Sequence, residues 1–76
     1  MISSAQFFRI FGTEFGVDPA DLSETQTLLQ DLEFDSFDML RLMILAESLR
    51  PGMTLPEDVD FETVTLGQVI QFVNER

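Results

Sequence analysis

The chain has 76 residues and is 45% apolar, so it can form one compact domain over residues 1–76. Fourteen acidic residues against four Arg give a net charge of −10, which excludes nucleic acid as a partner because the phosphates would be repelled. The absence of Cys, His and Lys excludes disulfides, thiolate or imidazole metal ligands and the usual catalytic bases and nucleophiles. No apolar run reaches membrane-spanning length and no signal peptide is evident, so we expect a cytoplasmic protein that is not an enzyme.

The first predicted element is a helix that begins after Ser3 and ends before Gly16. Ser3 and Gln6 have the spacing of a capping box, in which each side chain hydrogen-bonds the backbone of the other residue. Gly12 either lowers the helix propensity by about 1 kcal/mol relative to Ala or permits a close contact. Phenylalanine recurs at helical spacing, and we expect three of these side chains to face the core: Phe8, Phe11 and Phe15.

A long acidic loop is predicted next, because residues 18–38 contain seven acids and no base. Pro19 fits the first turn of a short helical segment, and we expect three leucines to hold the loop against the core: Leu22, Leu28 and Leu32. The acids from residue 31 onward superficially match a calcium-binding loop. Ser36 and Leu42 stand where that loop needs Gly and Glu, so no metal site is predicted.

The longest helical pattern extends from Ser36 to Leu49, and Pro51-Gly52 ends it. We expect Ser36 to be the N-cap residue. One arc of this helix suits the core and consists of Met39, Leu42, Leu45, Ala46 and Leu49. An almost opposite arc holds Leu40, Met43 and Ile44 together with Ser36 and Glu47. This second arc must either be covered by the chain or stay available to another molecule.

Two further helices complete the prediction. A short one is expected over residues 57–62, with Val59 or Phe61 facing inward, and a second capping box at Thr65 and Gln68 opens the last. Its apolar face consists of Leu66, Val69, Ile70 and Val73. The predicted fold is therefore an all-α four-helix bundle with a short third helix and a long loop between the first two helices.

The pattern Asp-Leu-x-x-Asp-Ser-x-Asp at residues 31–38, followed by an apolar helix, resembles the attachment site of the acyl carrier protein family. The likeness covers nearly the whole chain, including a first helix ending at Phe15-Gly16 and a Leu55-Pro56 step before the last helices. It implies a 4′-phosphopantetheine cofactor esterified to Ser36, whose thiol carries acyl cargo as a thioester. It also implies a monomer whose partners are a phosphopantetheinyl transferase and acyl-loading, condensing and other biosynthetic enzymes, with no membrane partner.

The acids and the second arc together predict a partner-binding surface: Asp35, Phe37, Asp38, Leu40, Arg41, Ile44 and Glu47. Charge would speed the encounter with basic docking surfaces of those enzymes. We favour direct contact for Leu40 and Ile44, whereas Phe37 and Met43 stay open between partner contact and core. The resemblance also implies room for cargo between the helices, and adaptable methionines either provide such room or simply fill the core: Met39, Met43 and Met53.

Departures from the family pattern favour a specialised fatty acid, polyketide or nonribosomal peptide pathway. Arg41 stands where carriers for fatty acid synthesis usually have an acid, and Phe37 replaces the usual Leu. Glu33 stands where the family very often has Gly, so we expect a turn without a positive φ angle. We also expect Arg41 to lie at the edge of the partner surface, with substitution changing stability by no more than about 0.5 kcal/mol. The alternative function is an acidic helical adaptor that docks into a basic partner, with Ser36 serving only as a cap.

Overall fold

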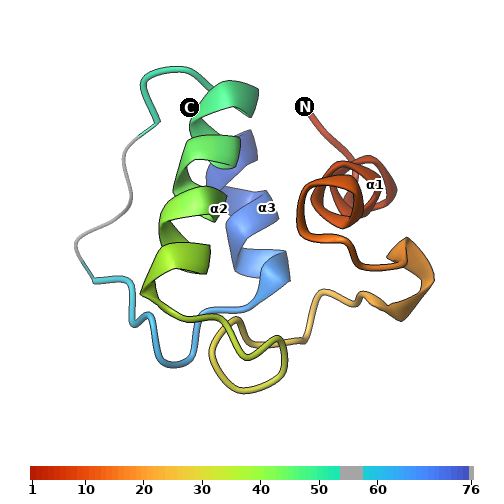
Figure 1. Ribbon diagram of the computed structural model, residues 1–76. Coiled ribbons are helices and arrows are strands. Elements are labelled where there is room, and N and C mark those ends of the chain that lie inside the picture. Colours follow the sequence, from red (N-terminus) through yellow and green to blue (C-terminus); the bar gives the residue numbers. More distant parts are fainter. Residues whose placement is uncertain (54–57, 76) are drawn as a thin grey trace.

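The computed structural model describes residues 1–53 and 58–75. Three α-helices lie within these ranges: α1 (Ser4–Phe15), α2 (Ser36–Leu49) and α3 (Leu66–Asn74), with one 3-10 turn at Pro19–Asp21. Helix α3 contacts α2 on one side and α1 on the other, and the long loop joins α1 to α2 (Figure 1). The described part of the chain is thus all-α.

The short third helix predicted at 57–62 is not formed in its described portion, and Glu57 lies outside the described residues. Residues 58–63 make turns around Asp60, whose carboxylate accepts a hydrogen bond from the Glu62 amide at 2.9 Å. The Asp60 carbonyl accepts the amides of Thr63 and Val64. An Asp side chain that bonds its own neighbouring backbone competes with helix formation, which explains the difference from the prediction.

Both predicted capping boxes are confirmed, at Ser3–Gln6 for α1 and at Thr65–Gln68 for α3. Gly16 ends α1 in the left-handed conformation, as a C-terminal glycine commonly does. Of the three expected core phenylalanines, Phe11 is fully buried, whereas Phe8 and Phe15 are half-buried against the core. Phe7, which was not among the three, is also fully buried. All four apolar residues expected on α3 are buried, and Leu66, Val69 and Ile70 belong to the hydrophobic core cluster.

The long loop is held to the core as expected. Leu22 and Leu28 are buried, and Leu32 is half-buried against the hydrophobic core. Backbone hydrogen bonds also attach the loop to the start of α3: the Leu28 amide donates to the Val64 carbonyl at 3.1 Å, and the Leu66 amide donates to Gln26 at 3.0 Å. Because apolar anchors and backbone bonds act together, the loop presents the start of α2 in one defined position.

The two arcs of α2 divide as predicted. Leu42 and Ala46 are buried, while Met39, Leu45 and Leu49 are half-buried against the core. The opposite arc is exposed. No helix in the ranges 1–53 and 58–75 is long and apolar enough to cross a membrane.

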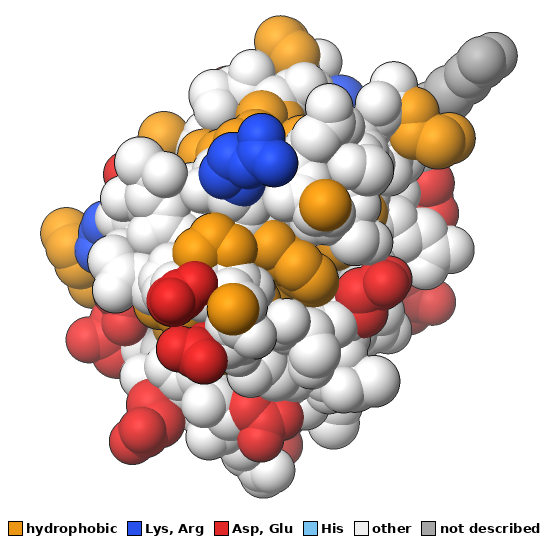
Figure 2. Space-filling view, turned by 90° about the vertical axis from the view of Figure 1, so that its right-hand side faces the viewer, with side chains coloured by type: hydrophobic (Ala, Val, Ile, Leu, Met, Phe, Trp, Pro, Cys, Tyr) orange, Lys and Arg blue, Asp and Glu red, His pale blue; other side chains and the backbone are white. Residues whose placement is uncertain are grey.

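The two ends of the bundle differ: acidic side chains gather at one end, and Ile2 pairs with Asn74 at the other. Acidic side chains gather toward the lower part of Figure 2, the end at which the loop and the first turn of α2 lie in Figure 1. The first residues of the chain and the end of α3 lie near the upper end of Figure 1. There the Asn74 side chain accepts the Ile2 amide at 2.8 Å and donates to the Ile2 carbonyl at 2.9 Å.

Candidate functional site

The N-cap of α2 is Asp35, not Ser36. The Asp35 carboxylate accepts the Asp38 amide at 2.8 Å, and the Asp38 carboxylate accepts the Asp35 amide at 3.3 Å, which makes a capping box of two aspartates. Asp is as good an N-cap as Ser, and a carboxylate also interacts favourably with the positive end of the helix dipole. The prediction that Ser36 caps the helix is therefore wrong by one residue.

This one-residue shift leaves the Ser36 hydroxyl uncommitted. Ser36 is the first residue of α2 and is exposed, and its hydroxyl makes no hydrogen bond to any of the described residues. The amides of the first helical turn have no carbonyl partner within the helix, and together with the dipole they favour an anion at this end. An exposed alcohol at such a position is well placed for esterification by a phosphate group.

Phe34 holds this end of α2 against α1, a role that the sequence analysis missed. Its side chain is buried and stacks on Phe11, with ring centroids 5.8 Å apart and planes 5° from parallel. The centroid of the Phe34 ring also lies 5.0 Å from the centroid of the Phe15 ring. A signal was present, because Phe34 and Met39 occupy the N′ and N4 positions of a hydrophobic staple around the Asp35 cap.

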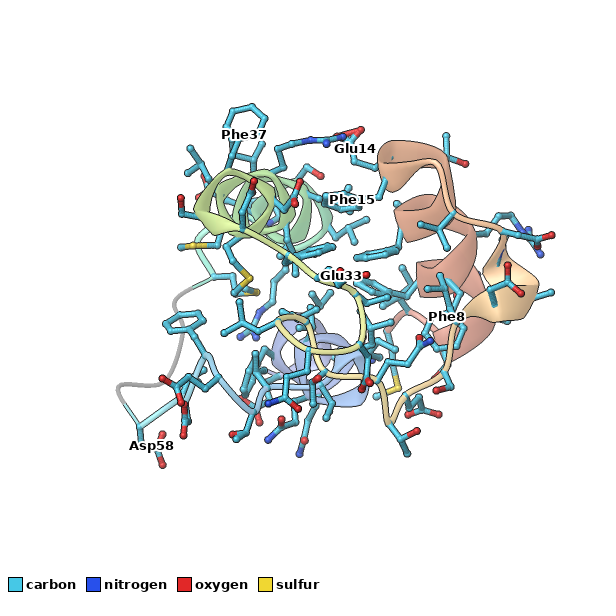
Figure 3. All side chains as sticks on the ribbon, turned by 60° about the horizontal axis from the view of Figure 1, so that its bottom comes forward. Phe8, Glu14, Phe15, Glu33, Phe37 and Asp58 are labelled. Atoms are coloured by element: carbon cyan, nitrogen blue, oxygen red, sulfur yellow. The ribbon has the colours of Figure 1, made fainter. Side chains whose placement is uncertain are left out.

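Glu33 has a φ angle of 55°, so the expectation of a turn without positive φ is wrong. The neighbouring contacts impose this conformation: the Phe34 amide donates to the Leu28 carbonyl at 2.9 Å while the Phe34 ring is buried. Glu33 itself is exposed and lies in the loop just before α2 (Figure 3). Glycine adopts this left-handed conformation at no cost, whereas the Cβ atom of Glu33 makes it unfavourable.

Glu33→Gly is therefore expected to stabilise the fold by about 0.5–1 kcal/mol, because relief of the left-handed strain exceeds the added entropy of the unfolded chain. Glu33→Ala is the matched control, since it removes the same charge but keeps the Cβ atom that causes the strain. Urea unfolding of the three proteins provides the comparison. Equal gains in both variants would assign the effect to charge and not to backbone conformation.

An apolar strip extends along the exposed arc of α2. Phe37 is 65% exposed, Ile44 63% and Leu40 54%, and Met43 is nearly half exposed. Phe37 points away from the bundle into solvent (Figure 3). Asp35 and Glu47 are exposed as well, whereas Asp38 is half-buried in the capping box. The structure therefore brings most of the predicted partner-surface residues onto one accessible side of α2.

Arg41 is the exception, because its side chain reaches across to the end of α1. Its Nη2 donates to the Glu14 carbonyl at 2.7 Å, and its guanidinium carbon lies 4.6 Å from the centre of the Phe15 ring. Glu14 and Phe15 lie together at that helix end in Figure 3. The Glu14 carbonyl belongs to the last turn of α1, where carbonyls lack helical partners and cations are favoured. An ion pair between Arg41 and Asp38 at 3.9 Å adds little, because the distance is long and both side chains keep about a third of their surface in solvent.

These contacts revise the expectation that Arg41 is nearly neutral for folding. Arg41→Met keeps the aliphatic stem but removes the hydrogen bond and the cation–π contact, so we expect a loss of about 1 kcal/mol. Arg9→Met is the control, because Arg9 is an exposed arginine on α1 and should change stability by less than about 0.5 kcal/mol. Denaturant midpoints measure both; equal midpoints for the two variants would contradict the role assigned to Arg41.

A small cavity of about 30 Å³ lies between α2, α3 and the 58–64 segment. The described residues that line it are all apolar, and they include the three methionines singled out from the sequence: Met39, Met43 and Met53. Figure 3 shows sulfur atoms on the side of α2 that faces the chain near Asp58. Either Val59 or Phe61 was expected to face inward. Val59 packs against the core, whereas Phe61 is 44% exposed, and both line the cavity.

Comparison with known proteins supplies the family. No protein-family model matches the chain, and no solved structure matches it significantly. The acyl carrier protein of Chlamydia muridarum (strain MoPn / Nigg) is 30% identical to it over 63 residues, which are 83% of this chain and 80% of the relative. Identity at this level across most of both chains agrees with the resemblance drawn from the residues around Ser36. The chain belongs to the acyl carrier protein family.

Proposed function

We propose that the protein is a cytoplasmic carrier that holds acyl or related intermediates as thioesters on 4′-phosphopantetheine attached to Ser36. The observation that carries this proposal is the position of Ser36: an exposed, uncommitted hydroxyl at the first residue of α2, in a member of a carrier family. The chain is then a substrate and a shuttle for other enzymes and performs no chemistry of its own.

The residues around Ser36 fit the proposed group. The Ser36 oxygen would carry the phosphodiester, and the amide groups at the start of α2 would face its negative charge. The negative charges of Asp35 and Asp38 would repel the phosphate and so oppose part of this attraction. Their carboxylates, however, accept each other's backbone amides and are not directed at the Ser36 hydroxyl. When bound, the group supplies a thiol for thioester formation. The protein contributes a fixed, water-exposed attachment point held by Phe34 and the capping box.

Partner enzymes are proposed to dock on the start of α2. Three acids precede the helix at Asp31, Glu33 and Asp35, whereas Arg41 and Ser48 lower the negative density along the helix itself. Leu40 and Ile44 give an exposed apolar centre on the helix that follows these acids. A basic docking surface with an apolar centre would complement this arrangement and allow fast association and release. The missing acid at position 41 supports service to a specialised fatty acid, polyketide or nonribosomal peptide pathway.

The second candidate is an acidic adaptor without a prosthetic group. The exposed apolar strip on α2 would serve such an adaptor equally well, so the strip does not discriminate between the two. The surroundings of Ser36 favour the carrier over the adaptor. In the adaptor Ser36 would serve only as the helix cap, and Asp35 has that role.

Intact mass spectrometry after incubation with coenzyme A, Mg²⁺ and a broad-specificity phosphopantetheinyl transferase tests the proposal. The expected result is the addition of one phosphopantetheine per chain. Unmodified protein, under conditions in which a known carrier is fully modified, would favour the adaptor.

A further inference from the structure

One side of α1 is left uncovered by the rest of the described chain. The helix buries Phe7 and Phe11, and Phe8 and Phe15 pack against the same core. Ile10 is half-buried, but it is not among the described residues that pack against this core. It lines an open, mostly apolar groove of about 410 Å³ between α1 and α2, together with four other residues: Arg9, Thr13, Glu14 and Leu45.

The uncovered side of α1 carries one cation and one anion at a fixed spacing. Residues at these intervals share one side of a helix, which we call the α1 face: Arg9, Ile10, Thr13 and Glu14. The side chains of Arg9 and Glu14 are exposed, and neither forms an ion pair within residues 1–53 and 58–75. They are five residues apart, which is roughly 7.5 Å along the helix axis.

Two copies of the α1 face are complementary when the helices pack antiparallel. In a two-fold dimer each contact between two residues is repeated with the copies exchanged. If Ile10 of one copy meets Thr13 of the other, the same register brings Arg9 level with Glu14 of the other copy, because both pairs are centred on the same point of α1. Two Arg–Glu ion pairs would then flank a contact made by the two isoleucines.

We propose that the α1 face is a weak dimerisation surface on which a second copy of this chain docks antiparallel. The inference goes beyond the proposed carrier function and does not depend on it. Ser36 precedes Leu45, the α2 residue of the groove, by nine residues, which is roughly 13 Å along the helix. A dimer therefore leaves the hydroxyl of both copies accessible.

The distribution of charge favours this face over the rest of the surface. The chain has a net charge of −10, but α1 contains one Arg and one Glu and is neutral. Figure 2 views the molecule from the side of α1: basic and apolar side chains occupy its middle, and acidic side chains lie mainly below. Charges more than about 8 Å apart are largely screened at physiological ionic strength, so acids far from the α1 face oppose the contact only weakly.

The small size of the contact sets its strength. One helix of 12 residues offers less area than a stable dimer needs. We therefore expect a dissociation constant of about 0.5 mM, so the chain is a monomer in dilute solution and a dimer only when concentrated.

Sedimentation equilibrium between about 20 µM and 1 mM, in about 0.15 M NaCl, tests the proposal. The parent should change from monomer toward dimer over this range. Glu14→Arg should weaken dimerisation at least tenfold, because two ion pairs become two repulsive contacts, although the net charge falls from −10 to −8. Glu47→Arg is the matched control, since it makes the same change of charge on α2 and should dimerise at least as well as the parent. A parent that is still monomeric at 1 mM, or an equal loss in both variants, would overturn the proposal.

Charge exchange separates a specific contact from damage to the fold. Arg9→Glu alone should also prevent dimerisation, but an equimolar mixture of Arg9→Glu and Glu14→Arg should form a heterodimer, because each chain then complements the other. The double variant Arg9→Glu/Glu14→Arg keeps the net charge of −10 and should dimerise within about threefold of the parent. A misfolded variant could not regain binding in the mixture. Absence of dimers in both the mixture and the double variant would overturn the assignment to the α1 face.

Discussion

Replacing Ser36 by alanine is expected to abolish attachment of phosphopantetheine completely while leaving the stability of the fold within about 0.5 kcal/mol of the parent. The first effect follows because the proposed acceptor oxygen is removed. The second follows because Asp35, and not Ser36, caps α2, so no helix cap is lost. Intact mass after incubation with coenzyme A and a transferase measures the first effect, and urea unfolding measures the second.

Two variants make this prediction specific. Ser48→Ala removes a hydroxyl near the other end of α2 and should leave modification complete. Asp35→Ala removes the cap and should cost about 1 kcal/mol, although the acceptor oxygen is still present. Modification of the Ser36→Ala protein would end the assignment of the attachment site. A loss of about 1 kcal/mol in Ser36→Ala, with none in Asp35→Ala, would return the cap to Ser36.

Gly12→Ala should destabilise the protein by about 2 kcal/mol and lower its melting temperature by roughly 10 °C. Helix propensity alone predicts the opposite sign, since Ala is favoured over Gly by about 1 kcal/mol inside a helix. The structure reverses this because a Cβ atom built at Gly12 would lie 2.4 Å from the backbone carbonyl oxygen of Val17 and 3.3 Å from the Pro19 ring. A backbone group cannot rotate away as a side-chain terminus can, so the turn after α1 would have to move.

Gly16→Ala is the matched control for this effect. Its φ angle is 70°, but a Cβ atom there would have nothing within 4 Å, so only the left-handed conformation is penalised, by about 1 kcal/mol. Thermal unfolding of both variants gives the comparison. If Gly12→Ala were as stable as the parent, the approach of Val17 to α1 would be adaptable and Gly12 would be an ordinary helix residue.

Local signals predicted the helices where they were strong. The capping boxes at Ser3 and Thr65 and the terminal Gly16 fixed the start of α1, the start of α3 and the end of α1, because each motif satisfies particular backbone groups. The buried arc of α2 was predicted from helical periodicity alone. The same periodicity identified the exposed arc, and burial in the structure agrees with both.

The predictions failed where two local interpretations compete. Asp35 and Ser36 are both good caps, and only the pairing of Asp35 with Asp38 selects between them. A short helix was predicted over residues 57–62, although the alternation of acidic and apolar residues there has a period of two and not the period of a helix. In the structure the Asp60 side chain stabilises a turn. Glu33 adopts a positive φ because Phe34 is held by distant rings, a tertiary constraint that has no local sequence signal. The contacts of Arg41 with α1 depend in the same way on how two helices pack.

The pairing of Asn74 with Ile2 has a practical consequence for how the protein can be handled. Because these two hydrogen bonds hold Ile2 beside Asn74, a dye or surface tether placed at either of these residues leaves from the same place. That place lies near the end of the bundle remote from the start of α2, so an immobilised molecule would present Ser36 outward (Figure 1). A short peptide that joined the chain at Ile2 to the chain at Asn74 would span little distance, which makes the fold a candidate for circular permutation with new ends opened in an exposed turn.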